Sequence, residues 1–168
     1  LVQIRSVLKL SHEPNRIECF DISTIQGASP VGSMVTFDGG APNKSRYRRF
    51  AIKNVDGQDD FAMMRELLLR RFKRAIEEQE LPDLVLIDGG KGQLNVALTV
   101  FKDLGIEDLE AVGIAKSRAL DTGGHSPERF FLPGMKDAII IQQNSPVVRL
   151  IAQIRDEAHR FAVTYHRK

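Results

Sequence analysis

The stretch PDLVLIDGGKGQLNVAL, residues 82–98, constrains the fold more than any other part of the sequence. Its first half is a run of strand-forming apolar residues without polar alternation, which is typical of a central strand covered on both faces. The run ends at Asp88, and a glycine-rich turn containing Lys91 follows before apolar residues recur at helical spacing. The stretch therefore predicts a strand, a tight turn and a helix, with a carboxylate at the carboxyl end of the strand.

Periodicity elsewhere predicts a mixed α/β sheet flanked by helices. The first three strands are separated by turn-forming segments and should form an antiparallel meander, whereas the later strands alternate with helices and should join the sheet in parallel. Expected strands cover 16–22, 31–37, 46–52, 83–87 and 111–116, with a hairpin at 129–142. Expected helices cover about 60–79, 94–105 and 145–161, the first with an apolar stripe of Phe61, Met64, Leu68, Phe72 and Ala75.

We expect one globular domain over residues 1–168, because a chain of this length, 42% hydrophobic and 27% charged, can bury one good core, whereas splitting it would leave two small halves. The chain begins without Met, so we expect a piece of a longer protein. No apolar run reaches the roughly 20 residues of a membrane helix, and we expect no membrane association. A lone Cys19 without zinc-ligand spacing favours a reducing, cytoplasmic setting. Because the net charge is only +2, any affinity for nucleic acid must come from local clusters.

Two aspartates are candidate metal ligands. Asp21 lies on an otherwise apolar side of the first strand and Asp88 ends the fourth, and in the expected sheet these strands can lie side by side. Two carboxylates brought together repel one another and need a shared proton or a cation. Oxygen ligands suit Mg²⁺ or Mn²⁺, ions that activate water for attack on phosphodiesters. The alternative is that Asp88 only forms a turn and caps the next helix.

The glycine-rich turn and the last helix add further candidates. Lys91 could steady the carboxylates or a phosphate, but the spacing is neither a P-loop nor a dinucleotide fingerprint, and we expect no small-molecule cofactor. His159 lies on the flank of the last helix. It could ligate metal or move a proton if that helix packs against the aspartates, and otherwise it is a partly buried surface group. The first interpretation of Asp59 and Asp60 is that they cap a helix. The second is that they supply outer carboxylates for a second metal.

Basic residues gather in two runs, NKSRYRRF at 43–50 and RRFKR at 70–74. Such runs are usually solvated faces. Two of them in a chain that is otherwise near neutral are compatible with a track for the phosphate backbone of DNA. The candidate DNA-binding residues are Lys44, Arg46, Arg48, Arg49, Arg70 and Arg74.

Several long motifs also occur in the order found in one known family. RIECFDIS, YRRF, DDFAMMRELLLRRF, LPDLVLIDGGKGQLNVAL and IRDEAHRFAVTYHRK together resemble the C-terminal endonuclease half of UvrC, the bacterial nucleotide excision repair nuclease. The resemblance covers nearly the whole chain. It implies an RNase H-like fold and a metal-dependent endodeoxyribonuclease that makes the incision 5′ to a lesion in damaged double-stranded DNA.

By motif, the resemblance implies an acidic site of Asp21 in FDIS and Asp88 in LIDGG, with His159 of DEAHRF in place of the last carboxylate of such folds. Asp60 in DDF matches a further acidic position associated with activity in the family. The family's nuclease for the 3′ incision, its UvrB-binding segment and its helix-hairpin-helix motifs match no part of this sequence. Binding to UvrB is therefore expected through a segment outside it.

Two rival interpretations stay open at this point. In the first, an RNase H-like scaffold only binds DNA or UvrB, and its acidic residues are structural. In the second, which rests on the glycine-rich turn alone, the chain is a small-molecule nucleotide-binding α/β domain. A saturable Mn²⁺ site that Asp88→Ala abolishes would separate the nuclease from the scaffold.

Overall fold

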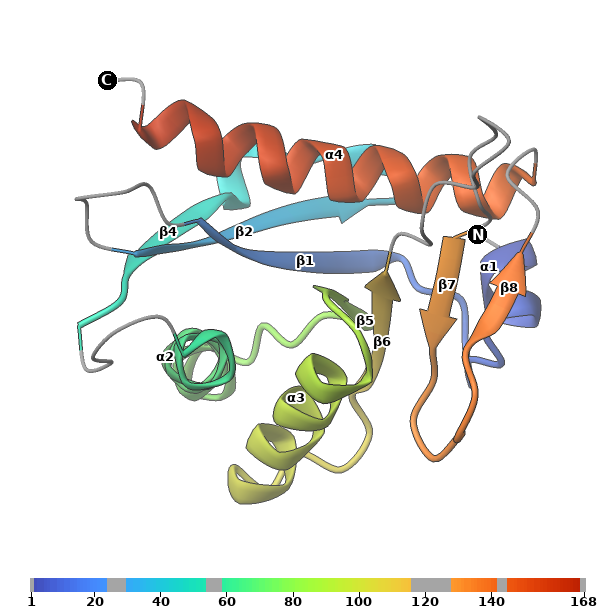
Figure 1. The fold of residues 1–168 in the computed structure, drawn as a ribbon, viewed down its shortest axis with the longest axis horizontal. Helices are drawn as coiled ribbons and strands as arrows, with labels where there is room; N and C mark the ends of the chain where they lie inside the picture. Colours follow the sequence, from blue (N-terminus) through green and yellow to red (C-terminus); the bar gives the residue numbers. More distant parts are fainter. Residues whose placement is uncertain (1, 24–29, 54–58, 116–127, 142–144, 167–168) are drawn as a thin grey trace.

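A single mixed sheet runs through the molecule and carries helices on both of its faces (Figure 1). The computed structural model describes all residues except 1, 24–29, 54–58, 116–127, 142–144 and 167–168. Two apolar cores result, one on each side of the sheet, and each is closed by its own helices. The expected mixed α/β class flanked by helices is confirmed.

Among the described residues the sheet has eight strands in the order β3-β2-β1-β5-β6-β7-β8, with β4 also pairing with β2. The pairs β1–β2 and β2–β4 are antiparallel, whereas β1, β5 and β6 run parallel. The expected meander followed by parallel strands is therefore present. The strands are β1 (Arg16–Ser23), β2 (Val31–Asp38), β3 (Ala41–Pro42), β4 (Arg48–Ala51), β5 (Leu84–Asp88), β6 (Glu110–Ala115), β7 (Glu128–Phe131) and β8 (Ile139–Ile141).

The centre of the sheet is β5, which explains its unbroken apolar run. Leu84 and Leu86 belong to the core under α4 (Pro146–His166). Val85 and Ile87 belong to the core under α2 (Asp60–Glu78) and α3 (Lys91–Asp103). All four side chains are 0% exposed. A strand buried on both faces cannot alternate polar with apolar residues, so the sequence pattern and the burial agree.

Helix α4 lies along one face of the sheet, and α2 and α3 cover the other (Figure 1). A short helix, α1 (Val2–Val7), packs its Ile4 into the core under α4. A single 3₁₀ turn, η1 (Lys44–Arg46), precedes β4. The sequence did not reveal α1 or β3, because six and two residues are too few to show a period. Within the described part of the chain, no helix combines the length and apolar character needed to cross a membrane.

Helix α2 begins where the sequence predicts, but its apolar stripe begins later. Asp59 is the N-cap, and its side chain accepts a hydrogen bond from the backbone N–H of Ala62. Phe61, expected to be the first residue of the stripe, is 53% exposed, so that expectation is wrong. Its ring packs on Gly92, where an added Cβ would lie 2.8 Å from the ring. The first turn of α2 thus lies against the start of α3 instead of the sheet.

Glu18 and Arg71 form a buried ion pair between β1 and α2. Arg71 donates from Nε to Oε1 at 3.1 Å and from Nη2 to Oε2 at 2.7 Å. The residues are only 1% and 6% exposed. Burial raises the pKa of Glu18, and the Arg71 guanidinium opposes that rise. This two-bonded contact fixes α2 against the strand that also carries Asp21.

Loss of one partner of this pair should destabilise the fold strongly. Arg71→Met leaves the Glu18 carboxylate buried without its cation, so the free energy of unfolding in urea should fall by about 3–5 kcal/mol. The double variant Arg71→Met with Glu18→Met should recover most of that loss, since no charge then stays buried. Equal losses in the single and double variants would contradict this account.

Candidate active site

The parallel pairing of β1 with β5 brings Asp21 and Asp88 together. Phe20 on β1 pairs with Ile87 on β5, so the next residue on each strand is an aspartate at the same level of the sheet. The residues two positions earlier on each strand belong to the core under α4. Because side chains alternate along a strand, both carboxylates face α4.

Negative charge accumulates at this end of the sheet. The Asp21 side chain is only 13% exposed. Burial, followed by the charge of Asp88, raises the pKa of Asp21 to about 6, while His159 acts in the opposite direction. Burial also raises the pKa of the Cys19 thiol well above its usual range, with Asp88 and Asp21 adding to that rise. The thiol is therefore neutral and no nucleophile, and the aspartates form a site that favours a cation.

His159 on α4 faces this site from the opposite layer. Its Nδ1 lies 3.6 Å from Oδ2 of Asp21, and its side chain is 72% exposed. The neighbouring Ala158 and Ile154 are 0% exposed, so His159 lies on the flank of the buried stripe of the helix. The structure thus brings a strongly exposed imidazole to a largely buried carboxylate, where it can contact solvent and the acidic pair together.

Arg155 is a residue near the site that the sequence analysis missed. It lies on α4, one helical turn before His159, and is 7% exposed. Its charge lowers the pKa of the Cys19 thiol, which places the guanidinium on the same side of the sheet as the aspartates. The i, i+4 spacing in RDEAH was the available signal. A basic residue in a polar stretch of a helix resembles a solvated charge, which is why it was not singled out.

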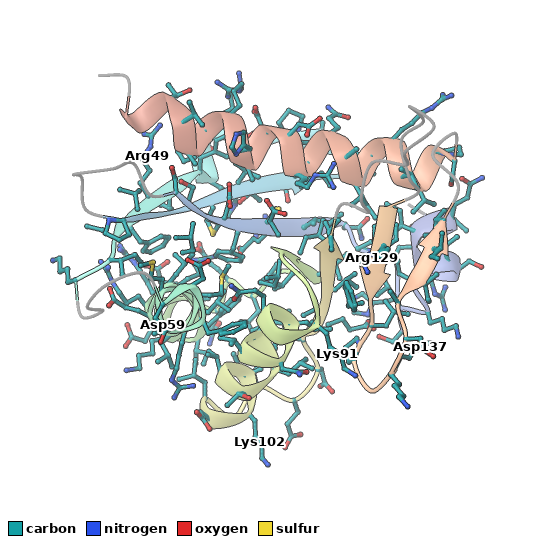
Figure 2. The ribbon with its side chains drawn as sticks, viewed as in Figure 1. Arg49, Asp59, Lys91, Lys102, Arg129 and Asp137 are labelled. Atoms are coloured by element: carbon teal, nitrogen blue, oxygen red, sulfur yellow. The ribbon has the colours of Figure 1, made fainter. Side chains whose placement is uncertain are left out.

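The other two predicted site residues, Asp60 and Lys91, come from the starts of α2 and α3. Asp60 is exposed and is followed by Phe61, whose ring packs on Gly92 in α3. The Nζ of Lys91 donates to the backbone carbonyl of Lys136 at 3.3 Å, in the loop between β7 and β8 (Figure 2). The structure therefore brings Lys91 to this loop and not to the aspartates.

The donor set suits a hard divalent cation, because two carboxylates and an imidazole from three elements face one another. Among the residues that the structure describes, no three His, Cys, Asp or Glu side chains are close enough to form a complete metal site. The acidic pair is the prearranged part, and His159 is an exposed donor beside it. The N-cap of α3 is Gly90, so Asp88 does not take the capping position that the turn interpretation gave it.

Five of the six predicted DNA-binding residues come together in space. Arg46, Arg48, Arg49, Arg70 and Arg74 line one cavity of about 320 Å³ between β4 and α2. Lys44 instead lines a separate hollow against α4. The two basic runs of the sequence therefore form one surface feature and not a continuous track.

The strand order, the helices on both faces and the carboxylates on adjacent central strands define an RNase H-like fold. The same fold occurs in the crystal structure of Ciona intestinalis Endonuclease V in complex with a 24mer DNA containing an inosine followed by a ribo-adenosine. The TM-score is 0.55 at 11% sequence identity, and the match covers 94% of this chain and 88% of that chain.

The family model of the UvrC RNAse H endonuclease domain matches residues 5–163, and the chain belongs to this family. The UvrABC system protein C of Geobacter metallireducens is 50% identical over 100% of this chain and 28% of its own length. That of Syntrophotalea carbinolica is 48% identical with the same coverage, 100% and 28%. The chain thus spans less than a third of the length of these relatives.

The raised pKa of Asp21 makes a prediction about stability. Because its folded-state pKa of about 6 exceeds the ordinary 3.8, ionised Asp21 disfavours folding above pH 6 and has no such effect below 3.8. In metal-free buffer, Asp21→Asn should therefore raise the free energy of unfolding at pH 8 by about 1–3 kcal/mol. The gain should vanish as the pH falls below about 4.

Asp38→Asn is the matched control for this measurement. Hydrogen bonds from Asn43 and Arg16 hold the pKa of Asp38 below its usual value, although burial opposes them. The sign is therefore reversed: ionised Asp38 favours folding above the unfolded pKa, so Asp38→Asn should lower stability at pH 8. If Asp21→Asn lost stability as Asp38→Asn does, Asp21 would be a structural residue.

Proposed function

We propose that this domain makes the 5′ incision at damaged double-stranded DNA in bacterial nucleotide excision repair. The observation that carries the proposal is the juxtaposition of Asp21 and Asp88 at the ends of β1 and β5, facing His159 on α4. Membership of the UvrC RNase H endonuclease domain family supports the nuclease reaction itself. The chemistry that joins these facts is hydrolysis of a phosphodiester bond, for which a paired-carboxylate site provides the metal ligands.

Asp21, Asp88 and His159 are the residues that would hold Mg²⁺ or Mn²⁺. Such an ion, when bound, activates water and neutralises charge on the scissile phosphate. The aspartates supply hard oxygen ligands and the negative charge that attracts the cation. A neutral imidazole is a softer ligand and adds no charge, so this site should bind its ion more weakly than an all-carboxylate site and should tolerate Mn²⁺ well.

His159 is also the group best placed to move a proton. Its ring is exposed on one side and lies 3.6 Å from Asp21 on the other, so it can exchange protons with solvent beside the reacting phosphate. Lys91 and Asp60 have accessory roles in this proposal. Lys91 would reach the phosphate by leaving the Lys136 carbonyl, and Asp60 would supply an outer carboxylate from the start of α2.

The partners follow from the same proposal. The substrate is damaged double-stranded DNA, and UvrB binds through a segment outside this sequence. The relatives carry the name UvrABC system protein C, which supports work within a multiprotein repair system. The cellular setting is the bacterial cytoplasm, and the domain uses no small-molecule cofactor.

Substitution of either aspartate should abolish the 5′ incision selectively. Asp21→Ala or Asp88→Ala removes a negative metal ligand, so the full-length enzyme should lose the 5′ cut. It should retain the 3′ cut, because a separate nuclease of the full-length protein makes that incision. Both products are measured on one lesion-bearing duplex, and Mn²⁺ titration should show loss of a saturable site. Loss of both cuts, or a 5′ cut that persists in Asp88→Ala, would leave the acidic residues as parts of a scaffold.

His159→Ala should reduce the rate of 5′ incision severely while the fold survives, because the side chain is 72% exposed and outside the buried stripe. His159→Asp should restore some metal binding by supplying a carboxylate. A near-normal rate in His159→Ala would remove this residue from the mechanism and favour Asp60 as the third ligand.

A further inference from the structure

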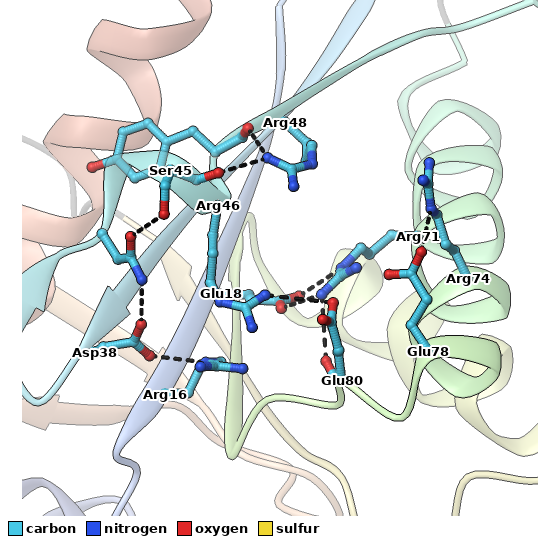
Figure 3. Close-up of polar contacts among 12 residues, drawn as sticks. Arg16, Glu18, Asp38, Ser45, Arg46, Arg48, Arg71, Arg74, Glu78 and Glu80 are labelled. Carbon is cyan, nitrogen blue, oxygen red and sulfur yellow. Dashed lines mark hydrogen bonds and ion pairs between the residues drawn. The ribbon is translucent and has the colours of Figure 1, made fainter.

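An arginine-lined cavity lies between β4 and α2, and the acidic residues are not part of its lining. Figure 3 shows several of its side chains, among them Arg48, Arg74 and Glu78. Its volume of about 320 Å³ is near the lower limit of small-ligand sites in proteins. Met34 and Phe50 contribute apolar lining, and the polar lining consists of Arg46, Arg48, Arg49, Arg70, Arg71, Arg74, Glu78 and Glu80. The cavity is too small for a duplex and large enough for a single charged group with its immediate attachments.

Positive charge exceeds negative charge in this lining, because six arginines accompany only two glutamates. Arg74 pairs with Glu78 at 2.9 Å, and Arg46 lies 3.5 Å from Glu80. Arg71 is held by the buried Glu18. Arg70 lies 3.7 Å from Glu66, and the guanidinium of Arg49 is turned toward Phe161 on α4. Arg48 therefore gives the cavity its excess of positive charge, and this excess attracts an anion.

Hydrogen bonds to backbone carbonyls hold the Arg48 side chain in place. Its Nη1 donates to the backbone carbonyls of Ser45 and Tyr47, both at 2.9 Å, and these contacts orient the guanidinium without neutralising it (Figure 3). Arg70 also donates to a backbone carbonyl, that of Ala51, but it lies 3.7 Å from Glu66 as well, which partly balances its charge. A guanidinium carries five N–H donors in a planar fork, so one anchored nitrogen leaves others to bind a phosphate in a two-bonded geometry. A carbonyl-anchored arginine therefore loses little entropy when the anion arrives.

We infer that this cavity binds one particular phosphate of the DNA strand, at a fixed distance from the bond that is cut. This inference rests on the proposed function, because it takes DNA as the ligand. It differs from a diffuse basic surface in that one phosphate enters the cavity and its neighbours do not. Planar arginines in a concave site suit a phosphodiester, and Phe50 beside them can contact the edge of the sugar.

The sheet register relates the cavity to the acidic site. Arg49 on β4 pairs with Ser33 on β2, and Ser33 pairs with Asp21 on β1. Two strand spacings of about 4.8 Å place the backbones of Arg49 and Asp21 about 10 Å apart. Because a DNA strand advances about 3.4 Å per nucleotide along the helix axis, the bound phosphate should lie within roughly five nucleotides of the incision.

Consecutive residues of β4 connect the two sites. Arg49 faces α4, where its guanidinium lies 3.8 Å from the ring centre of Phe161, two residues beyond His159. Arg48 pairs with Met34 and so faces the opposite side, toward α2. A strand of DNA that leaves the acidic pair therefore reaches the cavity by passing over β4.

A phosphate-by-phosphate scan with the full-length protein tests the inference. Lesion duplexes each carry one neutral methylphosphonate, and binding is measured by fluorescence anisotropy in metal-free buffer. The unsubstituted protein should lose roughly tenfold in affinity at one position within roughly five nucleotides of the 5′ incision, as expected for a hydrogen bond to a charged group. Arg48→Gln should abolish the penalty at that position only, and it should reduce the salt slope by roughly 0.9.

Arg65→Gln is the matched control. Arg65 lies on α2 and pairs with Asp103 at 3.0 Å, much as Arg74 pairs with Glu78 at 2.9 Å, but Arg65 does not line the cavity. It should keep the profile of the unsubstituted protein. Arg74→Gln, which changes an exposed side chain at the cavity, should reproduce the effect of Arg48→Gln and guards against a local folding defect.

A penalty spread evenly over many phosphates, an Arg48→Gln profile like that of the unsubstituted protein, or equal effects of Arg65→Gln and Arg48→Gln would overturn the inference. Unchanged DNA profiles with weaker binding of Arg48→Gln to UvrB would assign the cavity to an acidic protein segment and also overturn it. Since the scan requires neither metal nor cleavage, its result is independent of whether Asp88→Ala stops incision.

Discussion

The rest of the structure depends on the parallel pairing of β1 with β5. That pairing brings Asp21, near the end of β1, level with Asp88, the last residue of β5, and so places like charges side by side under α4. Burial of hydrophobic residues on both faces makes the pairing strong enough to hold that repulsion, since β5 has no exposed side chain before Asp88. The packed core therefore holds the two aspartates together despite their repulsion, and a bound cation would relieve that repulsion.

The sequence predicted the longer helices and strands, because their apolar residues recur often enough to reveal a period. The run before Asp88 indicated a central strand, and the alternation around Asp21 indicated a carboxylate on a buried side. Adjacency of the two strands was reached from topology alone, because a meander followed by helical crossovers leaves few arrangements. Short elements such as α1 carry no period, and they became visible only through packing against α4.

Side-chain partners were beyond the reach of sequence patterns. Phe61 has the spacing of a core residue, yet it packs on Gly92 because the first turn of α2 contacts α3. Lys91 follows Asp88 and two glycines in sequence, yet its ammonium reaches the carbonyl of Lys136. The basic runs showed how much charge was present, but not that most of their arginines would line one cavity. Each of these facts depends on tertiary contacts between segments that are remote in sequence.

Strand β1 carries two buried acids, and their different partners separate structure from function. Glu18 faces α2 and accepts hydrogen bonds from Nε and Nη2 of Arg71, so its charge has a permanent counter-charge supplied by the fold. Asp21 faces α4, where the nearby His159 is charged only when protonated and Asp88 raises its pKa. A buried acid with a permanent cation stabilises one arrangement, whereas a buried acid beside a second acid and an exposed imidazole is poised to exchange a proton for a metal ion. The same strand therefore anchors the scaffold on one face and forms the candidate catalytic centre on the other.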